Sequence, residues 1–187
     1  MFYVTESNTY EESIKKSRFI SVMLPCASEQ VVVQQFKTLQ AEHPHANHIA
    51  FAYRIKTIDG IIYRFNDAGE PTGTAGKPIF QYLEGKDIIN ALILVIRYFG
   101  GVKLGAGGLT RAYGHMAKQV IEASTLHAYM EMATLRFTLD YEKFQSFEYA
   151  LKKLQGQIIE QDFAGQIHLT ITLPAEKQYE LESQFLL

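Results

Sequence analysis

The chain has 187 residues, which is enough for one large hydrophobic core or two smaller ones. Hydrophobic residues make up 47% and charged residues 20%, a composition typical of a folded globular protein, which excludes a disordered chain. The net charge of −2 argues against a generally basic nucleic-acid-binding protein, so any such function has to come from a local patch.

Cysteine usage and apolar run lengths define the expected cellular setting. Cys26 is the only cysteine, so an internal disulfide is excluded and a structural zinc site is disfavoured. Residues 1–6 lack the basic start and apolar core of a signal peptide, and the longest apolar run, Ala91–Ile96, is too short to span a bilayer. We therefore expect a cytoplasmic protein that has no metal site, no cofactor and no contact with a membrane.

Hydrophobic periodicity predicts two hairpins and a helix in the first part of the chain. Residues 9–24 alternate as two strands around a basic turn, in which Lys16 and Arg18 are candidates for binding phosphate. The other expected elements are a helix at 29–42 and strands at 45–55 and 61–65, the latter two joined at Asp59–Gly60.

His43, His45 and His48 open the second hairpin and raise the question of a metal site. Spacings of two and three do not place all three on one face of a strand, and neither a nearby cysteine nor an HExxH motif completes a ligand set. The pattern favours polar residues at the start of a strand, bonded to loop carbonyls.

Residues 66–78 form a loop that is rich in glycine and proline, and loops of this length are either functional or disordered. Asp67 and Glu70 are close enough in sequence to be an acid–base pair or magnesium ligands. Alternatively, Asp67 forms a turn with its own backbone and Glu70 pairs with Lys77 or Arg111. Pro78 suits the first turn of a short helix that follows.

A glycine-rich stretch lies between the buried strand at 91–96 and a helix expected at 109–124. It holds five of the 13 glycines, and glycine permits positive φ and close approach to the backbone. Such a loop before a helix leaves free N–H groups that can bind an anion. The five are Gly100, Gly101, Gly105, Gly107 and Gly108.

Charge strengthens this interpretation, because no Asp or Glu occurs from Ile88 through Ile121. The sequence matches neither the P-loop nor the dinucleotide GxGxxG pattern, and tight packing alone is the alternative explanation for the glycines. The candidate anion- or nucleic-acid-binding residues are Lys16, Arg18, Arg97, Lys103, Gly105, Gly107, Gly108, Thr110 and Arg111.

A change of pattern near residues 131–134 indicates a domain boundary. A strand at 135–140 and a helix at 141–154 follow, then hairpin strands at 156–163 and 166–173 and a helix that starts at Pro174. The order β-α-β-β-α is the ferredoxin-like pattern without its last strand. We expect a three-stranded antiparallel sheet with an exposed edge.

Two sequence blocks, 66–78 and 95–113, resemble the signatures of the Impact/YigZ family, and residues 15–19 and 45–53 agree with it. The resemblance covers about residues 10–126, and the remainder is similar to the small C-terminal domain of bacterial YigZ-type members. It implies an α+β protein with an Impact-type domain at 1–131 and a ferredoxin-like domain at 135–187. The first would be a β/α sandwich like that of a small-subunit ribosomal protein and of domain IV of translocation factor G.

The resemblance implies a role in translation, since eukaryotic Impact proteins regulate translation during amino-acid starvation. The leading hypothesis is a non-enzymatic protein that binds RNA or the ribosome, with or without a translation-related protein partner, through the basic glycine loop. The alternative is an enzyme for a phosphorylated or peptide substrate, with Asp67 or Glu70 as base and Arg97, Lys103 and Arg111 holding an anion. A protein-interaction module is a third possibility. A closed pocket uniting acids and cations would favour the enzyme, and an open basic surface would favour RNA.

Overall fold

A computed structural model describes residues 1–185 and contains two compact units, Met1–Tyr129 and a second one from Met130 onward. The expected α+β organisation with two domains is confirmed. The sequence predicted a boundary near 131–134, and the contact-based division lies between Tyr129 and Met130. Within the described residues, no helix is both long enough and apolar enough to cross a membrane.

The first unit is built on a five-stranded antiparallel sheet with the order β2-β3-β6-β4-β5. Its central strand is β6 (Ala91–Tyr98), in which Ala91 through Ile96 are fully buried. A strand covered on both faces has no polar side, which explains why this run does not alternate. The other strands are β2 (Asn8–Ile14), β3 (Ser17–Pro25), β4 (His48–Thr57) and β5 (Gly60–Asn66).

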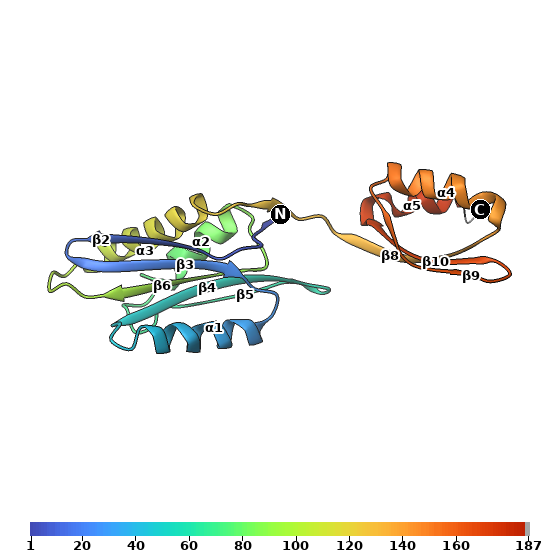
Figure 1. Ribbon diagram of the computed structural model, residues 1–187. Coiled ribbons are helices and arrows are strands. Elements are labelled where there is room, and N and C mark those ends of the chain that lie inside the picture. The colour runs from blue at the N-terminus through green and yellow to red at the C-terminus, as the bar shows by residue number, and fades with distance from the viewer. Residues whose placement is uncertain (186–187) are drawn as a thin grey trace. The chain divides into compact units, whose positions relative to one another are not determined.

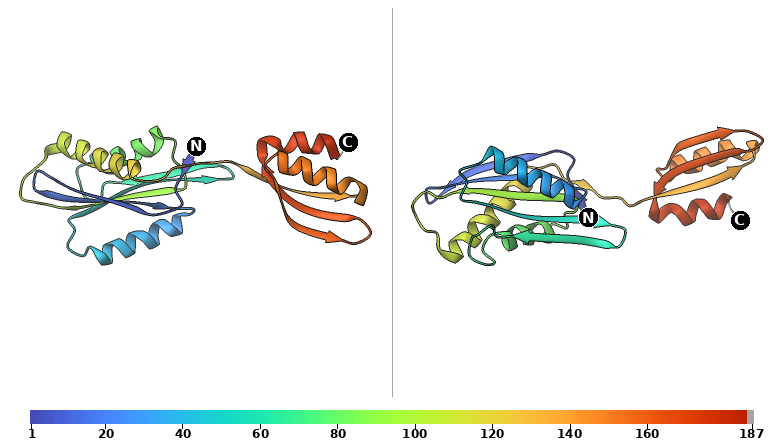
Figure 2. Two further views of the ribbon diagram at one scale, coloured as in Figure 1. Left: turned by 45° about the horizontal axis from the view of Figure 1, so that its top comes forward. Right: turned by 90° about the horizontal axis from the view of Figure 1, so that it is seen from below.

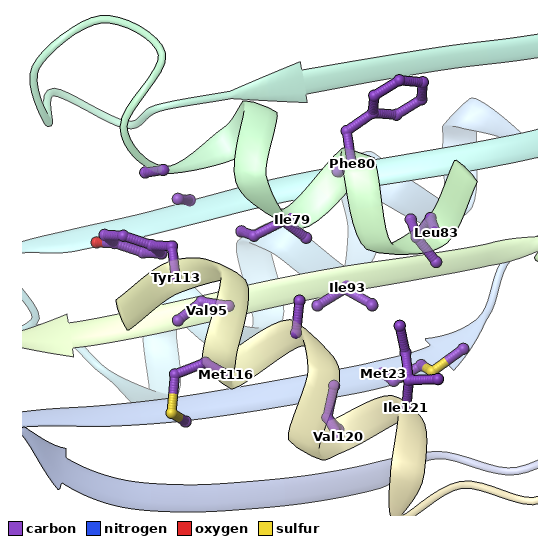
Figure 3. Packing of buried hydrophobic residues seen from close by; sticks show 14 of the residues in the cluster. Met23, Ile79, Phe80, Leu83, Ile93, Val95, Tyr113, Met116, Val120 and Ile121 are labelled. Atoms are coloured by element: carbon purple, nitrogen blue, oxygen red, sulfur yellow. The ribbon is translucent and has the colours of Figure 1, made fainter. Parts of the chain in front are cut away.

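Helices cover both faces of this sheet (Figures 1 and 2). Helix α1 (Glu29–Glu42) lies on one face, and α2 (Gly76–Gly85) and α3 (Gly105–Glu122) lie on the other. Figure 3 shows how Ile93 and Val95 of β6 pack against side chains from α2 and α3, among them Ile79 and Met116.

The turn between β2 and β3 consists of Lys15 and Lys16, which have φ values of 45° and 68°. Because Ile14 pairs with Ser17, this is a two-residue hairpin loop, and two positive φ values identify the type I′ turn that suits the twist of the strands. The basic cluster seen in the sequence is therefore the tip of a tight hairpin.

Helix α3 begins at Gly105, four residues before the predicted start at Leu109. Gly105, Gly107 and Gly108 therefore form the first turn of the helix instead of a loop. Glycine disfavours a helix by about 1 kcal/mol, but Leu109, Ala112 and Tyr113 are buried, and tertiary packing overrides such propensities.

A short strand pair was not predicted. Strand β1 (Phe2–Tyr3) pairs with β7 (His127–Ala128), so the first residues lie beside the end of the unit. The Phe2 amide also donates to the carbonyl of Asp87. Two-residue strands show no periodicity, so the sequence carried no signal for them.

The second unit has the predicted order β-α-β-β-α. Its antiparallel sheet has the order β8-β10-β9, and both helices pack on one face of it (Figure 2). Pro174 ends β10 and a short 3₁₀ turn, η1 (Ala175–Lys177), precedes the last helix; Leu186 and Leu187 lie outside the described residues. The elements are β8 (Met132–Leu139), α4 (Tyr141–Lys153), β9 (Gln157–Phe163), β10 (Ile167–Pro174) and α5 (Gln178–Phe185).

Candidate functional site

Glu70 is the centre of a buried polar cluster between β6 and α3. Its Oε1 accepts hydrogen bonds from Arg97 Nη1 at 2.7 Å and from the Tyr113 hydroxyl at 2.8 Å, and its side chain is only 4% exposed. The sequence suggested Lys77 or Arg111 as its partner, and this is wrong. Arg97 follows Ile93 and Val95 at a spacing of two, so it points into the face covered by α3, where Glu70 meets it.

Arg97 is consequently not a free cation. Its Nη2 donates to Ser17 Oγ at 3.3 Å, and its guanidinium lies over the ring of Phe19 at 5.6 Å and that of Phe99 at 5.5 Å. With Glu70 opposite, the two charges offset each other in a place where an unpaired ion would be unfavourable.

Tyr113 is a member of the site that the sequence assigned only to the core. Burial, and then the neighbouring Glu70 carboxylate, raises the pKa of its hydroxyl well above the ordinary value. Above about pH 10 the unfolded chain loses this proton while the folded chain keeps it, so the free energy of unfolding should fall as pH rises. Urea unfolding at a series of alkaline pH values should show a shallower decline for Tyr113→Phe than for wild type. Equal slopes for the two proteins would contradict this prediction.

Asp67 serves the loop in which it lies. Its Oδ1 accepts from the amides of Ala75 at 3.0 Å and Gly76 at 2.8 Å, and its Oδ2 accepts from the amide of Gly73 at 2.8 Å. These bonds satisfy N–H groups at the start of α2, which have no intrahelical acceptor. The structure thus matches the turn-forming alternative for Asp67, and Asp67 does not line the pocket beside Glu70.

A pocket of about 390 Å³ opens beside the buried cluster. Three of its lining residues, His48, Glu70 and Arg97, come from β4, the loop after β5, and β6, and opposite them lies the segment Lys103–Ala106 at the start of α3. The register of the sheet pairs His48 with Arg97, which explains how residues far apart in sequence share one wall. Phe99 also lines this pocket.

His48 has a defined orientation in this wall. Its Nδ1 lies 2.8 Å from the carbonyl oxygen of Ala68, in agreement with the expectation that these histidines bond loop carbonyls. Its Nε2 is 3.7 Å from Glu70 Oε2. The neighbouring His43 bonds to the hydroxyl of Tyr98 at 2.7 Å. Among residues 1–185 there is no group of three or more His, Cys, Asp or Glu residues that could hold a metal ion.

The predicted cations divide into paired and unpaired ones. Arg18 pairs with Glu11 at 2.6 Å, so it resembles Arg97 in having a carboxylate partner. For Lys16, Lys103 and Arg111 there is no ion pair within the described part of the chain, and the same holds for Lys15. These last four side chains are exposed.

The unpaired cations surround the glycine segment without meeting at one point. Lys103 lines the 390 Å³ pocket, whereas Arg111 lines a neighbouring hollow of about 310 Å³ together with Lys15 and Gly108. Leu104 lines both hollows. Lys16 is held close to the segment, since a Cβ on Gly100 would lie 1.8 Å from its carbonyl oxygen.

The start of α3 has no side-chain cap, because Leu104 at the N-cap makes no side-chain hydrogen bond. The amides of Gly105, Ala106 and Gly107 therefore lack intrahelical acceptors, whereas Gly108 is the fourth helical residue and its amide bonds back along the helix. The hydroxyl of Thr110 donates to the carbonyl of Ala106 at 3.0 Å and so belongs to the helix itself.

Comparison with known proteins identifies relatives of both units. Residues 15–121 match the Impact N-terminal domain, and residues 137–185 match a domain of unknown function, DUF1949. An IMPACT family member of Haemophilus influenzae is 34% identical over 172 residues, covering 91% of this chain and 83% of the relative. IMPACT family member YigZ of Escherichia coli is 33% identical over 177 residues, covering 94% and 87%.

A solved structure supports the same relationship. It is described as the crystal structure of a hypothetical protein and is similar with a TM-score of 0.70 and 32% identity, covering 98% of this chain and 89% of that chain. The Impact N-terminal match alone spans more than half of this chain, and the curated relatives extend over nearly all of it. The chain belongs to the Impact family.

Proposed function

We propose that this protein is a cytoplasmic regulator of translation that binds RNA, alone or on the ribosome, through a basic rim consisting of Lys15, Lys16, Lys103 and Arg111. The observation that carries this proposal is that all four cations are exposed, surround one glycine segment, and have no ion pair within residues 1–185. Unpaired surface cations are available to contact phosphates, and each contact releases counterions.

Membership in the Impact family supports the regulatory part of the proposal, because eukaryotic Impact proteins act on translation. The basic rim supports the RNA part. Arg18 and Arg97, which the sequence included among the phosphate-binding residues, are left out because Glu11 and Glu70 already neutralise them. Asp67 is not proposed as a catalytic base, since backbone amides occupy both of its oxygens.

The test is a titration of single-stranded RNA over a range of salt concentrations. The double variant Lys103→Ala/Arg111→Ala should bind more weakly than wild type. The plot of log affinity against log salt should be flatter by about 1.4–1.8, which is about 0.7–0.9 for each lost phosphate contact.

A matched control is Lys152→Ala/Lys153→Ala on α4, which removes two exposed lysines and the same total charge from the second unit. It should keep the affinity and the salt dependence of the wild type. Identical behaviour of the two double variants would exclude the rim as the binding surface. Absence of RNA and ribosome binding by wild type at low salt would overturn the proposed function.

For the fold in finer detail, we propose that the first unit is the β/α sandwich seen in translocation factor domain IV and that the second is a ferredoxin-like domain whose last strand is missing. Helices on both faces of the five-stranded sheet support the first assignment. The strand order β8-β10-β9 supports the second, because it leaves β8 at an edge where a fourth strand would pair.

A further inference from the structure

We propose that the 390 Å³ pocket is a ribonucleotide site, in which the start of α3 and Lys103 hold a phosphate while Glu70 and His48 accept hydrogen bonds from ribose hydroxyls. This inference rests on the proposed function, since the basic rim would bring RNA to the pocket. It adds a defined ligand to a surface that otherwise recognises only phosphate charge.

The first observation is an unused carboxylate oxygen. Glu70 is nineteen-twentieths buried, and Oε1 accepts both of its hydrogen bonds, from Arg97 and from Tyr113. Oε2 has no hydrogen-bond donor within the described residues, and its nearest polar neighbour is His48 Nε2 at 3.7 Å. A buried carboxylate oxygen without a donor is unfavourable unless a ligand or solvent supplies one.

His48 adds a second acceptor at the same place. A carbonyl oxygen can only accept, so Nδ1 must carry the proton that is donated to Ala68. In the neutral imidazole, Nε2 is then an acceptor as well. Two acceptors 3.7 Å apart therefore line the pocket without a donor between them, and adjacent sugar hydroxyls would satisfy both. Carboxylates bind ribose hydroxyls in this way in other nucleotide sites.

The opposite wall favours an anion. Gly105, Ala106 and Gly107 carry the amides without intrahelical acceptors, and Gly105 and Ala106 line the pocket together with Lys103. Because Arg97 already offsets Glu70, Lys103 and the positive end of the helix dipole give this wall its net charge. One wall thus matches a phosphate and the other a hydroxyl-bearing group.

The remaining wall is apolar and matches a nucleobase. Phe99 lines the pocket and is 45% exposed, and the guanidinium of Arg97 lies 5.5 Å from its ring centroid. An exposed aromatic ring at the edge of a pocket is a surface on which a base can stack. The volume of about 390 Å³ falls within the range of about 300–1,000 Å³ that is usual for small-molecule sites.

The experiment is a calorimetric titration of the full chain with adenosine 5′-monophosphate, its 2′-deoxy analogue, adenosine and inorganic phosphate. The monophosphate should bind, and the deoxy analogue should bind about tenfold more weakly because one hydroxyl donor is missing. Adenosine and inorganic phosphate should each be weaker than the monophosphate, since each occupies only part of the pocket. Equal binding of the ribo and deoxy forms, or of phosphate and the monophosphate, would overturn the inference.

His48→Phe tests the assigned acceptor and avoids the buried Glu70–Arg97 pair. It should weaken binding of the monophosphate about tenfold and abolish the preference for ribose over deoxyribose. The matched control is His45→Phe, at an exposed position that does not line the pocket, and it should behave as wild type. Far-UV circular dichroism and the thermal midpoint confirm that both variants are folded.

RNA oligonucleotides with and without a terminal phosphate separate this inference from the proposed function. If RNA binds through the rim but the monophosphate does not bind, the ribonucleotide site is wrong and the rim stands. If the monophosphate binds with a ribose preference but RNA does not bind, the RNA function is wrong and the pocket stands as a site for free nucleotides. Competition between the monophosphate and phosphorylated RNA ends would identify a terminal nucleotide as the ligand.

Discussion

Replacing Glu70 with alanine is expected to lower the free energy of unfolding of the first unit by about 3–5 kcal/mol. The substitution leaves the guanidinium of Arg97, whose side chain is only 6% exposed, without the carboxylate that neutralises it. The remaining bond, from Nη2 to Ser17, supplies no charge. A buried cation without a partner is among the few causes of destabilisation as large as this.

Urea unfolding followed by circular dichroism measures the effect, and Glu11→Ala is the matched control. The Glu11–Arg18 contact has a similar length, 2.6 Å against 2.7 Å, but about half of each side chain is exposed. Loss of that pair should change the stability by about 0–1 kcal/mol. The double variant Glu70→Leu/Arg97→Met should recover most of the loss, because no buried charge remains. Equal effects of Glu70→Ala and Glu11→Ala would refute the role assigned to burial.

The second large effect is expected for Gly100→Ala. A Cβ at this position would lie 1.8 Å from the carbonyl oxygen of Lys16 and 2.1 Å from its carbon, so the backbone of the β2–β3 turn has to move. Overpacking of this kind costs about 1–3 kcal/mol and sometimes more. The displaced turn carries Lys15 and Lys16, and RNA binding should weaken along with stability.

Gly85→Ala provides a control of opposite sign. Gly85 is the last residue of α2, no atom lies within 4 Å of a Cβ built there, and its φ is not positive. Alanine should therefore stabilise the protein by up to about 1 kcal/mol. Thermal unfolding of the two variants should shift in opposite directions from wild type. A shift in the same direction would show that the contact between Gly100 and the turn is not as close as described.

Much of the fold follows from local patterns, and particular residues show where these patterns end. The continuous apolar run of β6, the turn at Gly60 and the spacing along α4 predicted elements that lie within a few residues of the observed ones. The start of α3 was misplaced because the glycines at 105–108 disfavour a helix locally, while packing of the residues that follow favours it. The pairing of β1 with β7 joins the two ends of the unit and has no local signature.

The candidate site was harder to predict than the fold, because it depends on which residues meet. The acid-free stretch pointed correctly to Lys103 and Arg111 as unpaired cations, but Arg97 looked the same in the sequence. Its partner Glu70 is 27 residues away, and only the three-dimensional register brings them together. Strand alternation indicated that Arg97 points inward, as Val95 does, and this signal could have suggested a buried carboxylate partner.

The turn formed by Lys15 and Lys16 has a consequence for protein engineering. Both residues adopt positive φ, which lysine disfavours and which Asn-Gly would adopt more readily. If the basic rim binds RNA, the chain gives up folding stability at this turn in exchange for positive charge, a trade-off that is common at functional sites. Selection for heat resistance alone would then favour Asn-Gly at these two positions, and the resulting variants would be more stable but less able to hold RNA.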